Sequence, residues 1–445
     1  MTPCRAVPVA AVFGMVIALG SAPPAAYALT PPVIDDSLLP DARTPQPPRP
    51  TVQVQPCAAP VPSTAVPNSP MPALFDAVRS LSRGEGQRVA VIDTGVARHH
   101  RLARVEAGGD YVSAGDGTQD CDGHGTLVAG IIAATPDLDD PSGFAGGAPA
   151  ATVLSIRQSS TRFGPADDPS HAGFGDVVTM AMAVRTAADL GATVINISSI
   201  ACGAGPLDDG ALGAALAYAV DTEDAVVVAA AGNIGGAGRC PSQPVGDELT
   251  WESATVAASP GWYDDYVLTV GSVGPDGAPS AFTLPGPWVD VAAPGEQVVS
   301  LNPAGAGVIG VLPAAGPPAP ISGTSYAAPV VSGLAALIRS RFPELSARQV
   351  MRRIEDTAVA PGADWDPLVG YGIIDPAAAL STEAQLSPPA PQATALAAPR
   401  SPVSVSDPGS SVAVIGTAVC AGLLVTGLLV GRSRRAHHVV GGEGG

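Results

Sequence analysis

Three residues that could form one nucleophilic site lie far apart in the chain. Asp93 ends an apolar run in VAVIDTGV, His124 stands in DGHGTLVAG, and Ser325, in SGTSYAAP, follows Asp93 by about 230 residues. A serine hydroxyl is a weak nucleophile, so it needs a neighbouring base, and the base needs a third group to hold it. A carboxylate, an imidazole and a hydroxyl in this order, each in a frame that contains glycine, therefore predict a single assembled site.

Each of these frames also has a structural interpretation. Asp93 can present a carboxylate at the end of a strand, or it can cap the turn before Gly95. His124 begins an apolar helix, whose dipole disfavours the imidazolium and so favours the neutral form that accepts a proton. Ser325 follows Gly323, which permits a tight turn, and the helix after it directs free backbone N–H groups toward the hydroxyl. The three frames together favour the functional interpretation over a coincidence of turns and caps.

Asn233 adds a fourth polar group, just after the apolar run of VVVAAAGN. A side-chain amide there could donate a hydrogen bond to a developing oxyanion, alongside the backbone N–H of Ser325. The alternative is a turn asparagine before Gly235 and Gly236.

The pattern between Arg88 and Leu380 indicates the elements that position these residues. Strand-like runs occur at Val89–Ile92, Val153–Ile156, Thr193–Ile197, Val226–Ala230, Val267–Val273 and Val289–Ala292. Helix-like runs occur at Gly125–Ala134, Val177–Leu190, Ala211–Val220 and from Ser325 to Ser340, with another helix capped by Ser346. Strands that are apolar on both faces and alternate with helices predict an α/β fold, in which helices cover both sides of a parallel sheet.

The two ends of the chain predict its compartment. Residues 1–28 carry Arg5, an apolar run and a small-x-small site ending at Ala28, which is typical of a secretory signal peptide. Near the other end, the 19 residues Val412–Val430 carry no charge, and three arginines follow. This predicts a transmembrane helix at 411–431, a cytoplasmic tail at 432–445 and a main domain outside the cytoplasm. The alternatives are an uncleaved anchor at the first end and a buried core helix at the second.

Proline marks the remaining boundaries. There are 13 prolines between Pro31 and Pro72, so the segment 29–84 is predicted to be an extended arm rather than a compact domain. A main domain at 85–380 follows, and a Pro/Ala/Ser linker at 381–410 separates it from the membrane helix.

Charge and cysteine usage narrow the class of protein. The net charge of the 445 residues is −18 and all 22 basic residues are arginine, which argues against nucleic-acid binding. The sequence holds no spaced calcium loop and no CxxC pair, so neither a metal nor another cofactor is expected. Outside the two hydrophobic ends, four cysteines in an oxidising compartment suggest two disulfides. Of three pairings, Cys57–Cys121 with Cys202–Cys240 is favoured, with a zinc site as the alternative.

The strings DTGV, HGTLVAG, AAAGN and SGTSYAAP occur in the order of the signatures of the subtilase family of serine proteases, which the chain resembles over roughly residues 85–380. The resemblance implies a subtilisin-like three-layer α/β fold with a mostly parallel central sheet. It implies a serine endopeptidase in which Ser325 is the nucleophile, His124 the base and acid, Asp93 its orienting group, and Asn233 a donor of the oxyanion hole.

The same resemblance implies two chain segments between which a peptide lies extended. One wall is formed by Ser198, Ser199 and Ile200, and the other by Ala230, Ala231 and Gly232. The favoured disulfides fit this arrangement, because Cys202 and Cys240 follow the two walls and Cys121 stands three residues before the histidine.

A narrower resemblance adds a cellular setting. The proline-rich arm with one cysteine, the string SIRQSS at Ser155–Ser160 and the C-terminal membrane helix are together similar to the mycosins, membrane-anchored subtilases of type VII secretion systems. The chain departs from the wider family in lacking room for the usual pro-domain, in carrying Tyr326 where methionine is commoner, and in a long apolar stretch at 301–320. That stretch could cover the cleft, bind a partner or form a passive loop.

Two functions therefore compete as hypotheses. The first is a membrane-anchored endopeptidase that acts on protein or peptide substrates and associates with membrane components of a type VII secretion system. The second is a mainly structural part of that complex, with proteolysis secondary. A freely secreted degradative protease is a third reading, which requires release of the anchor.

Overall fold

The computed structural model of the protein describes residues 29–59, 71–140, 142–170, 172–235, 239–244, 249–313, 317–360, 362 and 365–382. The predicted signal peptide at 1–28, nearly all of the linker and the predicted membrane span at 411–431 lie outside these ranges. Within them, no helix combines the length and the apolar character that crossing a membrane requires.

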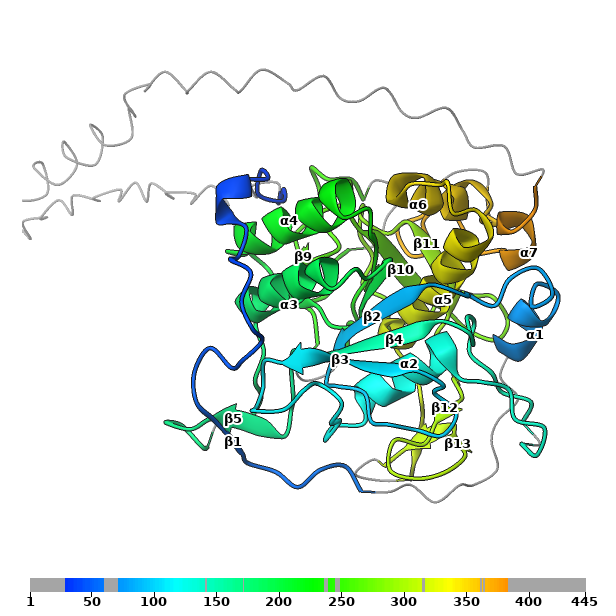
Figure 1. The fold of residues 1–445 in the computed structure, drawn as a ribbon. Helices are drawn as coiled ribbons and strands as arrows, with labels where there is room; N and C mark the ends of the chain where they lie inside the picture. The colour runs from blue at the N-terminus through cyan, green and yellow to red at the C-terminus, as the bar shows by residue number, and fades with distance from the viewer. Residues whose placement is uncertain are drawn as a thin grey trace, which may run out of the picture. The chain divides into compact units, whose positions relative to one another are not determined.

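A seven-stranded sheet forms the centre of the molecule (Figure 1). Its strands are β2 (Arg88–Asp93), β3 (Val105–Asp110), β4 (Thr152–Arg157), β6 (Val194–Ile197), β8 (Val226–Ala230), β10 (Leu268–Val273) and β11 (Val291–Pro294). They are ordered β11-β10-β8-β6-β2-β4-β3, and every neighbouring pair is parallel. The parallel sheet predicted from the apolar runs is confirmed, and all carboxyl ends of the strands point to one edge.

Helices cover both faces of this sheet (Figure 1). On one face, α2 (His124–Ala133) packs against α5 (Thr324–Arg341), and α5 crosses the central strands. On the other face, α3 (Val177–Asp189) packs against α4 (Gly210–Ala217), which a π-helical turn at Tyr218–Thr222 continues. The shorter helices are α1 (Met71–Asp76), α6 (Ala347–Asp356) and α7 (Pro376–Ala379).

Helix starts follow from the capping residues. The hydroxyl of Ser346 accepts a hydrogen bond from the backbone N–H of Gln349, and the Gln349 side chain accepts one from the N–H of Ser346, so a reciprocal capping box begins α6. The cap predicted at Ser346 is therefore confirmed. Asp176 caps α3 in the same way, through Thr179.

The described residues also form four small two-stranded sheets outside the central sheet. They are β1 (Thr51–Gln53) with β5 (Phe163–Pro165), β7 (Ala201–Gly203) with β9 (Ala257–Ser259), β12 (Ser300–Leu301) with β13 (Val308–Ile309), and β14 (Val311–Leu312) with β15 (Ala319–Pro320). The apolar stretch at 301–320 therefore contributes two hairpins rather than a featureless loop. The Ser300 hydroxyl donates to the carbonyl of Leu127 at 2.6 Å, so the first hairpin lies against the helix that begins at His124.

The described part of the proline-rich arm lies against this core, and it is not extended throughout as predicted, because it forms a 3-10 turn at Asp36–Leu38 and the helix α1. β1 adds to β5 as an antiparallel strand, and the side chains of Leu29, Ile34 and Leu39 pack on the main hydrophobic core. The backbone N–H of Ala58 donates to the carbonyl of Cys121 at 2.8 Å, beside the Cys57–Cys121 disulfide. The core also reaches back before residue 85, because Phe75 is completely buried in it.

The buried carboxyl group of Asp290 predicts a pH-dependent stability. Burial, followed by the charges of Asp264 and Glu355, raises the pKa of Asp290 well above its ordinary value, although the N–H of Thr269 donates to it at 2.6 Å. The folded chain thus binds this proton more tightly than the unfolded chain, so stability falls as pH rises from about 4 toward the folded pKa.

Asp290→Asn keeps an acceptor for the Thr269 N–H and removes this titration. As pH rises through that window, the free energy of unfolding of the variant is expected to increase relative to that of the wild type by up to about 1.4 kcal/mol per pH unit. Thermal unfolding of both proteins between pH 4 and pH 8 measures the difference. Parallel stability curves would contradict the prediction.

Candidate active site

Asp93 stands at the carboxyl end of β2, between the neighbouring strands β4 and β6. Its side chain is only 3% exposed, and both carboxylate oxygens lie near His124 Nδ1, at 2.8 and 2.9 Å. The N–H of Thr94 also donates to Asp93 Oδ1 at 2.7 Å, which fixes the carboxylate. This contact orients the imidazole so that Nε2 is the nitrogen left for the site.

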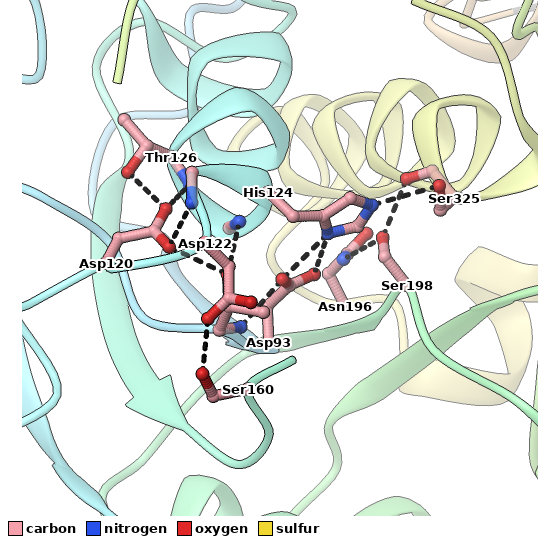
Figure 2. A network of polar contacts seen from close by, with 12 residues as sticks. Asp93, Asp120, Asp122, His124, Thr126, Ser160, Asn196, Ser198 and Ser325 are labelled. Atoms are coloured by element: carbon pink, nitrogen blue, oxygen red, sulfur yellow. Dashed lines mark hydrogen bonds and ion pairs between the residues drawn. The ribbon is translucent and has the colours of Figure 1, made fainter. Parts of the chain in front are cut away.

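His124 Nε2 lies 3.1 Å from Ser325 Oγ, although the two residues are 201 positions apart (Figure 2). His124 begins α2, Ser325 lies in the first turn of α5, and these two helices pack on each other. The structure thus brings Asp93, His124 and Ser325 into one continuous chain of polar contacts. Tyr326 is buried and its ring centroid lies 5.2 Å from that of His124, so it packs against the imidazole.

Two further carboxylates, which the sequence analysis did not select, hold the histidine loop. Asp120 accepts hydrogen bonds from the N–H groups of Gly123 and Thr126 at 2.7 and 2.8 Å, and from the hydroxyls of Thr126 and Thr94 at 2.6 and 2.8 Å. It therefore caps the start of α2, while burial raises its pKa to about 6. In the sequence, the one signal for a role of Asp120 was its position four residues before His124.

Asp122 ties the same loop to the segment after β4. Its carboxylate accepts from the Ser160 hydroxyl at 2.5 Å (Figure 2), and it also accepts from the Thr161 N–H at 2.8 Å. Gly123, at φ 89°, makes the left-handed turn between this aspartate and the helix, where an L side chain would be strained.

The charge balance around His124 differs from the expectation based on the helix dipole alone. Burial lowers the pKa of the imidazole, but the charge and hydrogen bond of Asp93, together with the charges of Asp120 and Asp122, outweigh it and raise the pKa above its ordinary value. The imidazolium is therefore more favoured than in a free histidine, because the charges of three carboxylates near one ring exceed the effect of burial.

Asn233 faces the first turn of α5 from the end of β8. Its Oδ1 accepts a hydrogen bond from the N–H of Thr324 at 3.1 Å, which leaves the Nδ2 group as the donor end of the amide. The Thr324 hydroxyl in turn accepts from the N–H of Gly232 at 3.1 Å. The Ser325 N–H is among the first four of its helix, which have no acceptor within the helix. The two candidate oxyanion donors therefore belong to adjoining segments.

The two predicted walls leave the sheet side by side, because β6 and β8 are neighbours. Ser198, Ser199 and Ile200 follow β6 directly, and Ala231 and Gly232 follow β8. In the second wall, the N–H of Ala231 donates to the carbonyl of Val270, and the carbonyl of Gly232 accepts from the N–H of Leu284, each at 2.9 Å. These two backbone groups of the second wall are therefore already bonded within the protein.

Both favoured disulfides are present. Cys202 in β7 is bonded to Cys240, which joins the segments that follow the two walls, and Cys57 is bonded to Cys121 in the histidine loop. On the chain-entropy model, closing the loop between Cys202 and Cys240 contributes about 3–4 kcal/mol. A cavity of about 140 Å³ opens beside the first wall, with Met180, Ile200 and Leu212 in its lining. In the described part of the chain, no three His, Cys, Asp or Glu side chains are arranged to hold a metal ion.

Comparisons with known proteins agree with this geometry. The model of the subtilase family matches residues 84–372. Mycosin-4 of Mycobacterium tuberculosis (strain ATCC 25618 / H37Rv) is 56% identical over 453 residues, covering 98% of this chain and 98% of that protein.

Two solved structures have similar folds. The crystal structure of MycP1 from the ESX-1 type VII secretion system has a TM-score of 0.74 at 42% identity, and covers 82% of this chain and 99% of that one. A chain in the periplasmic assembly from the ESX-5 inner membrane complex has a TM-score of 0.75 at 40% identity, and covers 84% of this chain and 99% of that one.

Proposed function

Because the chain belongs to the subtilase family, and within it to the mycosins, we propose that it is a membrane-anchored peptidase that acts outside the cytoplasm. It is a serine endopeptidase with the subtilisin-like three-layer fold. The proposal concerns which residues perform the reaction, where the protein is held and what it assembles with.

In the proposed mechanism, Ser325 attacks the carbonyl carbon of a peptide bond while His124 Nε2 takes the hydroxyl proton. Asp93 holds the other ring nitrogen and stabilises the imidazolium that forms. The Asn233 amide and the Ser325 N–H donate to the oxyanion. His124 then protonates the leaving amine, and water hydrolyses the acyl-enzyme by the reverse sequence of proton transfers. The observation that carries this assignment is the 3.1 Å contact between His124 Nε2 and Ser325 Oγ, continued at Nδ1 by Asp93.

A fluorophosphonate probe tests the assignment, because it reacts with an activated serine. The wild type is expected to be labelled at Ser325, and Ser325→Ala is expected to remain unlabelled. Equal labelling of both proteins would remove Ser325 from the role of nucleophile.

The Asn233→Ala variant is expected to lower kcat about 10²–10³-fold, because one oxyanion donor is lost. KM is expected to change little, since the amide is aimed at charge that develops only in the transition state. Steady-state kinetics on a peptide substrate separate the two constants. A rise in KM with unchanged kcat would place Asn233 in ground-state binding instead.

We propose a signal peptide at 1–28 and a membrane span at 411–431, which place the domain at 85–380 on the outer side of the membrane. The similar chain in the periplasmic assembly from the ESX-5 inner membrane complex supports components of a type VII secretion system as partners. Purification of the tagged full-length protein from membranes tests this proposal. Recovery of the protein only from culture medium would contradict the anchor.

The second candidate function is a structural role in the secretion complex. Its motivation is the amount of chain outside the catalytic core, namely the arm and the hairpins of residues 300–320. Complementation of a deletion strain distinguishes the two functions. Rescue of secretion by Ser325→Ala, but not by a chain that lacks 412–430, favours the structural role, and the reverse result excludes it.

A further inference from the structure

Proline at position 329 leaves the backbone carbonyl of Ser325 without its helical partner. In an α-helix this carbonyl accepts from the N–H of the residue four positions later, which here is Pro329, inside α5. Proline has no N–H, and its ring crowds the carbonyl four residues before it. The residue that carries the reactive hydroxyl therefore cannot be held by the normal ladder of its own helix.

The side chain of Ser198 takes the place of the missing donor. Its hydroxyl donates to the carbonyl of Ser325 at 2.8 Å, from the segment that directly follows β6 (Figure 2). Ser198 is itself 6% exposed, so water does not compete freely for this acceptor. Ser325 is half-buried, so loss of this donor would leave its carbonyl partly shielded from water and without the protein partner that replaces the helical bond, which gives this hydroxyl an influence on the position of Ser325.

Two buried side chains fix the direction of that hydroxyl. Asn196 Nδ2 donates to Ser198 Oγ at 2.9 Å, so the single proton of Ser198 points toward Ser325. The amide of Asn196 is oriented in turn by Ser332, whose hydroxyl donates to Asn196 Oδ1 at 2.8 Å. Asn196 and Ser332 are fully buried, and every bond in this series runs in one direction.

The series begins and ends on the same helix. Ser332 lies about two turns after Ser325 on α5, and the hydrogen bonds pass between them through the end of β6. We propose that Ser332, Asn196 and Ser198 are positioning residues, which replace the helical bond lost at Pro329 and hold Ser325 at the correct distance from His124. The proposal rests on the assignment of Ser325 as nucleophile.

The Ser198→Ala variant tests the direct contact. Its kcat is expected to fall about 10- to 100-fold, the range that a small displacement of a reacting group can cost. KM and the pH at which kcat/KM is half-maximal are both expected to stay near the wild-type values. The hydroxyl of Ser198 donates to the carbonyl of Ser325, and it contacts neither His124 nor the substrate. The rate of fluorophosphonate labelling is expected to fall with kcat, since that reaction needs the nucleophile but no bound peptide.

Pro329→Ala supplies the missing backbone N–H, and it gives the sharper test. In the Ser198→Ala/Pro329→Ala double variant, the carbonyl of Ser325 can accept from residue 329 instead of from Ser198. If the two substitutions act independently, the kcat of the double variant relative to the wild type equals the product of the relative kcat values of the single variants, to within about twofold. The double variant is expected to be clearly more active than that product. Ser340→Ala is the matched control, because its hydroxyl also donates from α5 to a backbone carbonyl, that of Glu85 at 3.0 Å. It is expected to leave kcat unchanged.

The results distinguish a failure of the positioning role from a failure of the proposed function. A folded Ser198→Ala variant with raised KM and normal kcat, or a double variant without rescue, overturns the positioning role. Failure of the probe to label wild-type Ser325 would refute the proposed function itself, independently of these variants. If Ser198→Ala does not fold, Asn196→Asp carries the same test, because a carboxylate cannot donate to Ser198 but fits the same space.

Discussion

The Ser325→Ala variant is expected to lose about 10⁶-fold in kcat on a peptide substrate. The members of a serine triad act as a unit, so removal of the nucleophile alone costs nearly as much as removal of all three. The residual rate comes from binding and from the oxyanion donors, which this substitution leaves in place. Progress curves at high enzyme concentration, with the wild type diluted to match, measure the ratio.

Ser322→Ala provides the control for this loss. Ser322 lies three residues earlier, and its hydroxyl accepts from the N–H of Gln297 at 3.2 Å, away from the polar contacts of His124. Its activity is expected to equal that of the wild type. A Ser325→Ala protein that retains more than a small fraction of the activity would show that another group attacks the substrate.

The Asp93→Asn variant is expected to lose about 10⁴-fold in kcat near neutral pH. Both oxygens of Asp93 face Nδ1 of His124, at 2.8 and 2.9 Å, so the carboxylate accepts the proton of that nitrogen. An amide can turn its NH₂ group toward Nδ1 and thereby place the ring proton on Nε2, where it blocks proton transfer from Ser325.

The pH dependence gives a second readout of the same variant. In the wild type the pKa of His124 is raised, so kcat/KM is expected to fall as pH decreases through a value above about 6.5. Asp93→Asn removes the largest of the charges that raise this pKa, and the fall is expected to move to lower pH. Profiles measured from pH 5 to pH 9 show the shift, and coincident profiles would mean that Asp93 does not control the ionisation of His124.

The centre of the fold could be predicted because its strands are buried on both faces. Val226–Ala230 carries no polar residue and Val153–Ile156 only Ser155, and the two runs coincide with β4 and β8 to within a residue at each end. The edge strand β3 was not predicted, because VEAGGD has two glycines, two acidic residues and only partial burial. The strand β11 was predicted at Val289–Ala292, but it begins two residues later, at Val291. The N–H of Val289 donates to the carbonyl of Gly286 in a turn, so Val289 does not pair with the neighbouring strand.

Some residues of the site could likewise be predicted from the sequence, and others became apparent only in the structure. Asp93, His124, Ser325 and Asn233 stand in short frames that the sequence itself marks, and the structure places them close together. Asp120, Asn196 and Ser332 have no such frame, because their importance comes only from partners that folding supplies. An asparagine inside VINIS looks like any polar interruption of a strand until its neighbours on α5 are known.

The bond between Cys57 and Cys121 has a consequence for maturation of the protein. A protease that cuts at any point between these residues breaks the chain, but the two pieces stay covalently joined across 64 positions. Trimming in this interval therefore cannot release the arm while the cystine is intact. Such nicked molecules would keep their full mass on a non-reducing gel and separate into two bands only after thiol treatment.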